Sequence, residues 1–127
     1  MENKINSLFD LSNKTVILTG AAGFLGSQCA EGLSLAGANL VLADKNYSKC
    51  KKLSDYLKEK YNSKAIAIKL DVTKRKSIKN MIKKSIEKFS TIDVLINNAV
   101  FPEGEKERRY AFEDFPLSIW NNVISVN

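Results

Sequence analysis

The chain has 127 residues, of which 44% are hydrophobic and 27% are charged, as in an ordinary globular protein of one domain. No apolar run approaches the roughly 20 residues of a membrane-spanning helix, and the polar stretch 1–14 lacks the apolar core of a secretory signal. Cys29 and Cys50 have no CxxC or metal-ligand spacing. We therefore expect one cytoplasmic domain over residues 1–127, with reduced thiols, no membrane and no metal.

The net charge of +6 does not by itself indicate a nucleic-acid partner. The lysines cluster over 45–60 and 74–88, within two amphipathic patterns. The first apolar stripe is Cys50, Leu53, Leu57 and Tyr61, and the second is Ile78, Met81, Ile82, Ile86 and Phe89. Such lysines fit the solvated outer faces of helices on a sheet, so we expect no nucleic acid; an acidic partner is the alternative.

Apolar runs and helical patterns alternate along the chain. Strands are predicted at 15–19, 39–43, 65–70 and 93–97. Helices are predicted over 24–36, 48–60, 74–89 and 117–126, the last cut short. Gly37 should cap the first helix, and the charged segment 101–114 should be a loop. This order predicts an α/β fold, a doubly wound parallel Rossmann sheet covered on both faces and truncated after the fourth strand and part of the next helix.

The turn after the first strand carries the strongest functional signal. Gly20, Gly23 and Gly26 directly follow the run 15–19 and open a helical segment. Gly20 can make the tight turn, Gly23 can let a pyrophosphate approach the backbone, and Gly26 can let the helix pack on the strand. The helix start then favours the anion. The sequence predicts a dinucleotide cofactor, and Gly20→Val should abolish its binding while leaving the fold largely intact.

Asp44 ends the second predicted strand. An acid at this place can bind the ribose hydroxyl groups of the adenosine and repel a 2′-phosphate, which favours NAD over NADP. Lys45 weakens this preference for NAD, because a cation beside the ribose could accept that phosphate. The alternative role of Asp44 is a helix or turn cap.

Four motifs, in this order, resemble those of the short-chain dehydrogenase/reductase family across essentially the whole chain. They are the cofactor turn 19–26, the Asp-Val-Thr motif 71–73, the strand end 93–99 and the helix 120–127. The resemblance implies cofactor contacts from Thr19, Gly20, Gly23, Phe24, Leu25, Gly26, Asp44, Asp71, Val72, Asn98 and Ala99.

The resemblance also implies individual roles. Asp71 would contact the adenine, with capping of the next helix as a compatible or alternative role. Asn97 would brace the sheet, and Ala99 would leave room for the cofactor. Asn127 would be the active-site asparagine, which helps to hold a water molecule in the proton relay.

Two features depart from the classical pattern of the family. The glycine spacing resembles that of the extended branch, which contains sugar-nucleotide epimerases and dehydratases, whereas Asn97, Asn98 and Ala99 resemble the classical branch. Val100 replaces a usual glycine. The subfamily and the substrate therefore stay open; a further resemblance is to bacterial oxidoreductases of flagellin and surface-sugar modification.

Family members use a Ser, a Tyr and a Lys beyond the asparagine. The Tyr-x-x-x-Lys matches Tyr47/Lys51 and Tyr56/Lys60 fall in the second helix, at the adenosine end, so we interpret both as chance. Arg108 and Arg109 could meet an anionic substrate group, but a solvated loop is favoured.

The resemblance implies a full-length NAD-dependent oxidoreductase acting on an alcohol or carbonyl, such as a sugar or sugar nucleotide. Such an enzyme would be a homo-oligomer, and this chain alone would be inactive. A non-catalytic dinucleotide-binding or sensor protein is the alternative.

Overall fold

The computed structural model describes residues 8–102 and 109–127. Its strands are β1 (Thr15–Thr19), β2 (Asn39–Asp44), β3 (Ala65–Lys69) and β4 (Val94–Ile96). Its helices are α2 (Phe24–Leu35), α3 (Tyr47–Tyr61), α4 (Arg75–Phe89) and α5 (Leu117–Val126), with the short 3₁₀ helix η2 (Phe112–Asp114) before α5. The predicted order of elements is confirmed, and the predicted ends coincide with the observed ends or differ from them by one residue. Gly37 adopts a φ of +86° just after α2, as its capping role requires.

The strands form one parallel sheet in the order β3-β2-β1-β4. β1 is central, and all five of its residues are buried. The chain adds β2 and then β3 on one side of β1 and returns to add β4 on the other. This reversal lies at the carboxyl ends of β1 and β4, where open α/β sheets bind their ligands.

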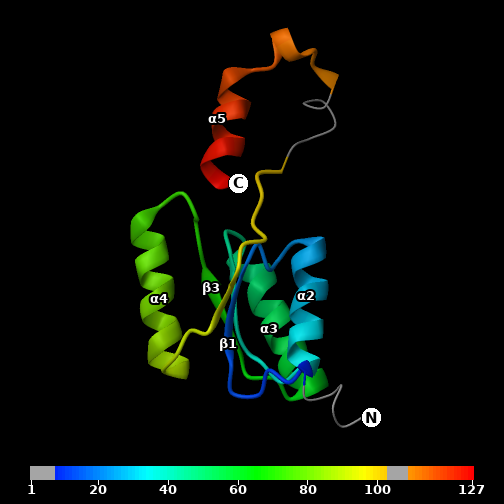
Figure 1. The fold of residues 1–127 in the computed structure, drawn as a ribbon, viewed down its shortest axis with the longest axis vertical. Coiled ribbons are helices and arrows are strands. Elements are labelled where there is room, and N and C mark those ends of the chain that lie inside the picture. Colours follow the sequence, from blue (N-terminus) through cyan, green and yellow to red (C-terminus); the bar gives the residue numbers. More distant parts are fainter. Residues whose placement is uncertain (1–7, 103–108) are drawn as a thin grey trace.

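Helices lie on both faces of the sheet: α2 and α3 on one, α4 on the other (Figure 1). The alternation of side chains along β1 explains the two layers. Val16 and Leu18 pack in the cluster that contains Leu57 of α3, whereas Ile17 packs in the cluster that contains Met81 of α4.

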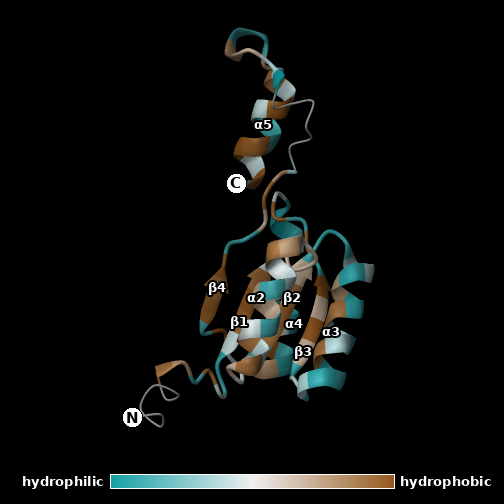
Figure 2. Cartoon of the chain, turned by 90° about the vertical axis from the view of Figure 1, so that its right-hand side faces the viewer, coloured by the Kyte–Doolittle hydropathy of each residue, from teal (hydrophilic) through white to brown (hydrophobic). Residues whose placement is uncertain are grey.

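The second face is covered by a single helix among the described residues. α4 packs over β2 and β3, and β4 forms an apolar edge of the sheet (Figure 2). Val94 and Leu95 of β4 are 38% and 54% exposed, and Ile82 and Ile86 of α4 are each 44% exposed. Helices on both faces are thus confirmed, but β4 is left partly exposed within the described residues, because α4 packs over β2 and β3.

α5 stands beyond the carboxyl ends of the strands (Figure 1), and none of its residues is buried. Among the described residues, no helix has both the length and the apolar character that crossing a membrane requires.

Candidate functional site

The glycine turn is fixed to the end of β2 by its first N–H groups. The N–H of Ala21 donates to the carbonyl oxygen of Ala43 at 3.3 Å, and the N–H of Ala22 donates to Oδ2 of Asp44 at 3.1 Å. The N–H of Gly23 donates to the carbonyl oxygen of Gly20 at 3.1 Å. Three successive backbone donors are thus used within the protein, which gives the turn a defined shape.

The three glycines are required for different reasons. Gly20 has a φ of +65°, and a β-carbon there would lie 2.8 Å from Cα of Ala99. A β-carbon at Gly26 would overlap the carbonyl oxygen of Gly20. A β-carbon at Gly23 would meet only that oxygen, at 3.3 Å, and otherwise open space. The expectation that Gly20→Val leaves the fold intact is therefore wrong, because the added side chain would strain the turn and meet the backbone after β4. Gly23 is the glycine whose missing side chain leaves open space.

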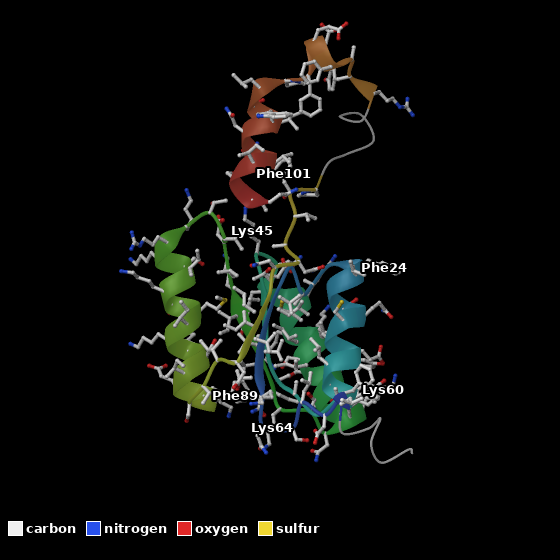
Figure 3. The ribbon with its side chains drawn as sticks, in the orientation of Figure 1. Phe24, Lys45, Lys60, Lys64, Phe89 and Phe101 are labelled. Carbon is white, nitrogen blue, oxygen red and sulfur yellow. The ribbon has the colours of Figure 1, made fainter. Side chains whose placement is uncertain are left out.

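The start of α2 offers backbone donors to a ligand. Gly23 is the N-cap residue, it makes no side-chain cap bond, and the first turn holds no acidic residue. The N–H groups of Phe24, Leu25 and Gly26 have no acceptor within the helix, since the first turn of any helix lacks one. The positive end of the helix dipole adds to their attraction for an anion. In Figure 3, Phe24 and Lys45 lie at the same end of the sheet.

Asp44 connects the glycine turn to the next helix. Its Oδ2 accepts the bond from Ala22, and its Oδ1 accepts the N–H of Asn46 at 2.9 Å. Asn46 is the N-cap of α3. The turn-capping role is therefore confirmed for Asp44. Its carboxylate also lines the pocket described below, so the cap holds the acid in place there.

Thr19 and Asn98 cross-link the ends of β1 and β4. Oγ1 of Thr19 donates to the carbonyl oxygen of Ile96 and accepts the N–H groups of Asn98 and Ala99, both at 3.1 Å. Nδ2 of Asn98 donates to the carbonyl oxygens of Thr19 at 3.0 Å and of Gly20 at 3.2 Å. The bracing role predicted for Asn97 therefore belongs to Asn98, which makes these bonds, whereas Asn97 is exposed. Thr19 is buried behind the pocket, where it positions the turn.

These elements surround a pocket of about 470 Å³ at the carboxyl ends of the strands. Nine of the predicted cofactor residues line it; Thr19 and Asp71 do not. The sequence analysis assigned no cofactor contact to Ala43, Leu70, the loop residues 100–102 or Val126, which are small or apolar. The lining consists of Gly20, Gly23, Phe24, Leu25, Gly26, Ala43, Asp44, Lys45, Leu70, Val72, Asn98, Ala99, Val100, Phe101, Pro102 and Val126.

Asp71 lies beside this pocket, at the end of β3. Its Oδ1 accepts the N–H and the hydroxyl group of Thr73, at 3.0 Å and 2.7 Å. These two bonds, the hydroxyl bond first, hold the pKa of Asp71 below its ordinary value, and the charge of Lys45 lowers the pKa further. The N-cap of α4 is Lys74, so the cap predicted for Asp71 is instead a tight turn that precedes the helix.

Asn127 ties the end of α5 to the pocket. Its Oδ1 accepts the N–H of Phe101 at 2.8 Å. Phe101 and Val126 both line the pocket, so this bond holds two parts of its wall together. The relay role of Asn127 stays a prediction.

The Tyr56/Lys60 match lies elsewhere. Nζ of Lys60 donates to the hydroxyl group of Tyr56 at 2.6 Å and to Oε1 of Glu31 at 2.9 Å, and Tyr61 also donates to Glu31. This cluster joins α3 to α2 at the end of the sheet opposite Lys45 (Figure 3), and none of its residues lines the pocket. The prediction that this match is not catalytic fits that placement.

The second match and Arg109 contribute no residue to the pocket lining. Lys51 pairs with Asp55 at 2.5 Å, on the exposed side of α3, and neither Tyr47 nor Lys51 lines the pocket. Arg109 is exposed, and Arg108 lies outside the described residues.

Known proteins share both the sequence and this arrangement. The chain is 32% identical over 123 residues to the 5-keto-D-gluconate 5-reductase of Escherichia coli, covering 97% of this chain and 46% of that protein. It is 34% identical over 118 residues to an NADP-dependent 3-hydroxy acid dehydrogenase of Schizosaccharomyces pombe, covering 91% of this chain and 46% of that protein. The chain thus spans about half the length of the curated relatives it matches.

A solved structure extends the similarity to the fold. A protein from Haemophilus influenza, described as a D-mannonate oxidoreductase and crystallised with bound NAD, has a TM-score of 0.81 and 29% identity, covering 96% of this chain and 48% of that one. The family described as short chain dehydrogenase matches residues 14–127. With this match, the parallel sheet and the glycine turn at its switch point, the chain belongs to the short-chain dehydrogenase family.

Proposed function

We propose that this chain is the cofactor-binding part of an NAD-dependent oxidoreductase that transfers hydride to or from an alcohol or carbonyl carbon. One observation carries the proposal: the open space at Gly23 adjoins the uncapped start of α2, and both face the pocket that Asp44 lines.

The residues of the pocket fit the parts of a dinucleotide. The N–H groups at the start of α2 and the bare backbone at Gly23 suit a pyrophosphate. The carboxylate of Asp44 suits two ribose hydroxyl groups, and Val72 and Asp71 suit an adenine. When bound, the nicotinamide would supply or accept the hydride. The contacts that we assign to Phe24, Leu25, Asn98 and Ala99 are part of this proposal.

The preference for NAD over NADP depends on Asp44. Its negative charge would repel a 2′-phosphate, and its position is fixed by two backbone bonds. The similar proteins differ in this respect, since one is named NADP-dependent and another was solved with NAD. We therefore base the proposed preference for NAD on the charge of Asp44 and not on the similar proteins.

The proposed substrate is a small polyhydroxylated carbonyl or alcohol, such as a sugar or sugar derivative. Two of the similar proteins are named for sugar acids, 5-keto-D-gluconate and D-mannonate. We propose that the residues that exchange the substrate proton belong to the longer protein, because neither Tyr-Lys match lies at the pocket. Asn127 would position a water molecule for them.

The proposal extends to location and assembly. Cys29 and Cys50 form no disulfide with each other, which suits a reducing cytoplasm. The exposed apolar residues of β4 and α5 suit contact with further parts of the enzyme or with a second copy.

Calorimetric titration of the full-length protein with NADH and NADPH tests the binding. We expect NADH to bind about tenfold more tightly, which corresponds to about 1.4 kcal/mol, and Asp44→Ala to narrow that difference. Tighter binding of NADPH would refute the assignment of Asp44.

Measurement of turnover tests the proposed oxidoreductase activity. We expect the full-length protein to oxidise NADH in the presence of a keto sugar, and residues 1–127 alone to show no turnover above a Gly23→Ala control. Tight NADH binding without turnover of any alcohol or carbonyl by the full-length protein would favour a sensor instead.

A further inference from the structure

The ends of β2 and β3 place an ion pair at the rim of the pocket. Lys45 directly follows β2, and Asp71 lies two residues beyond the end of β3. Nζ of Lys45 lies 3.6 Å from Oδ2 of Asp71. β2 and β3 are in parallel register up to the pair Asp44 and Lys69. The ion pair therefore results from the pairing of two strands, and nothing in the sequence around either residue reveals it.

Lys45 is the cation best placed to select the cofactor. It lines the pocket and adjoins Asp44, the proposed ribose-binding residue. Its side chain is 63% exposed, so an anionic ligand could reach it. A basic side chain beside this ribose is what a 2′-phosphate requires. In the structure, however, the ammonium group of Lys45 pairs with Asp71.

Asp71 is held firmly as the partner of Lys45. Its Oδ1 accepts two bonds from Thr73, which leaves Oδ2 directed toward the ammonium group. The pKa of Asp71 is lowered by the same contacts, first by the Thr73 hydroxyl group, so the carboxylate is charged at neutral pH. This charged carboxylate therefore competes with a phosphate for Lys45.

We propose that Asp71 is a positioning residue for cofactor specificity: it holds Lys45 in an ion pair and so withholds from a 2′-phosphate the cation that would accept it. The inference rests on the proposed dinucleotide function of the pocket. It adds a second cause of NAD preference to the repulsion by Asp44. The two causes are separable, because the effect of Asp71 requires Lys45, whereas simple charge repulsion does not.

A double-mutant cycle distinguishes the effect of the Lys45–Asp71 ion pair from simple charge repulsion by Asp71. The wild-type full-length protein, Asp71→Asn, Lys45→Gln and the double variant are titrated with NADH and with NADPH at one fixed, low salt concentration. Asparagine keeps an oxygen that can accept the Thr73 bonds, so the turn at the end of β3 should persist. Asp55→Asn is the matched control, because it removes an exposed carboxylate from the Lys51 pair on α3, away from the pocket lining.

We expect Asp71→Asn to shift the ratio of the two dissociation constants toward NADPH by about threefold to fivefold, the upper range for exposed charge interactions. In the Lys45→Gln background the same change should leave the ratio unaltered, as should Asp55→Asn in the wild type. Asp55→Asn should also leave NADH binding unchanged, because Asp55 does not line the pocket.

Three results would overturn the inference alone. In the first, the wild type binds NADH but Asp71→Asn does not change the ratio of the two dissociation constants. In the second, Asp71→Asn changes this ratio equally in the presence and in the absence of Lys45. In the third, the wild type already prefers NADPH. A wild-type protein that binds neither cofactor would overturn the proposed function of the pocket, and this inference with it.

Discussion

Replacing Gly23 by alanine should separate cofactor binding from folding. The added methyl group would lie 3.3 Å from the carbonyl oxygen of Gly20 and would otherwise enter open space. The backbone at Gly23 has φ −75° and ψ 169°, which alanine adopts without strain. The substitution therefore adds a methyl group to the wall of the pocket and requires the Gly20 carbonyl oxygen to shift by only a few tenths of an ångström.

The two effects on stability nearly cancel. Alanine is a poorer N-cap residue than glycine by several tenths of a kcal/mol. The loss of backbone freedom in the unfolded chain contributes about 0.4–1 kcal/mol in the opposite direction. We therefore expect the free energy of unfolding to change by less than about 1 kcal/mol.

The effect on binding should be larger. If the pyrophosphate approaches the backbone at Gly23, the methyl group excludes it from at least one N–H group, and a hydrogen bond to a charged group contributes about 1.5–3 kcal/mol. The dissociation constant for NADH should therefore rise at least about tenfold. Calorimetric titration measures the binding, and urea denaturation of the same preparation measures the stability.

Gly32→Ala in the same helix is the matched control. A β-carbon there meets nothing within 4 Å, so this variant should be about 0.5–1 kcal/mol more stable and bind NADH normally. Unchanged NADH binding by Gly23→Ala would show that the phosphate site lies elsewhere. Weakened binding accompanied by a large loss of stability would contradict the structural reasoning.

Three further predictions follow from single contacts. Gly26→Ala, and likewise Gly20→Val, should destabilise the fold by about 1–3 kcal/mol in urea denaturation, because each forces side-chain atoms against the backbone. A variant as stable as the wild type would contradict the close packing around these glycines. The pKa of Asp93 lies below its ordinary value of 3.8 because its carboxylate accepts the N–H of Thr15. The stabilisation of the fold by this carboxylate is complete above the unfolded pKa and is lost as the pH falls through the lower folded pKa, so Asp93→Asn should lose less stability than the wild type between about pH 5 and pH 3. Equal loss of stability in the two proteins over this range would exclude a stabilising role for Asp93. Tyr56→Phe should leave NADH binding and turnover in the full-length protein unchanged, and a large loss of turnover would mean that the Tyr-Lys match takes part in the chemistry.

The order of elements, the glycine turn and the acid at the end of β2 could all be predicted from the amino-acid sequence. These are local properties. Hydrophobic periodicity distinguishes a strand such as β1 from a helix such as α3, and three glycines in eight residues indicate a turn with little steric freedom for side chains. Gly20, Gly23 and Asp44, which carry the strongest of these local signals, all line the pocket.

Which residues brace the site and which line the pocket depends on the three-dimensional arrangement of the strands. The contacts of Thr19 with Asn98 and of Lys45 with Asp71 join residues far apart in the chain, and they depend on which strands are neighbours in the sheet. The bond between Phe101 and Asn127 also joins residues far apart in the chain, and it connects two parts of the pocket wall. Strand order and helix placement are set by the packing of whole faces, which no short stretch of sequence encodes.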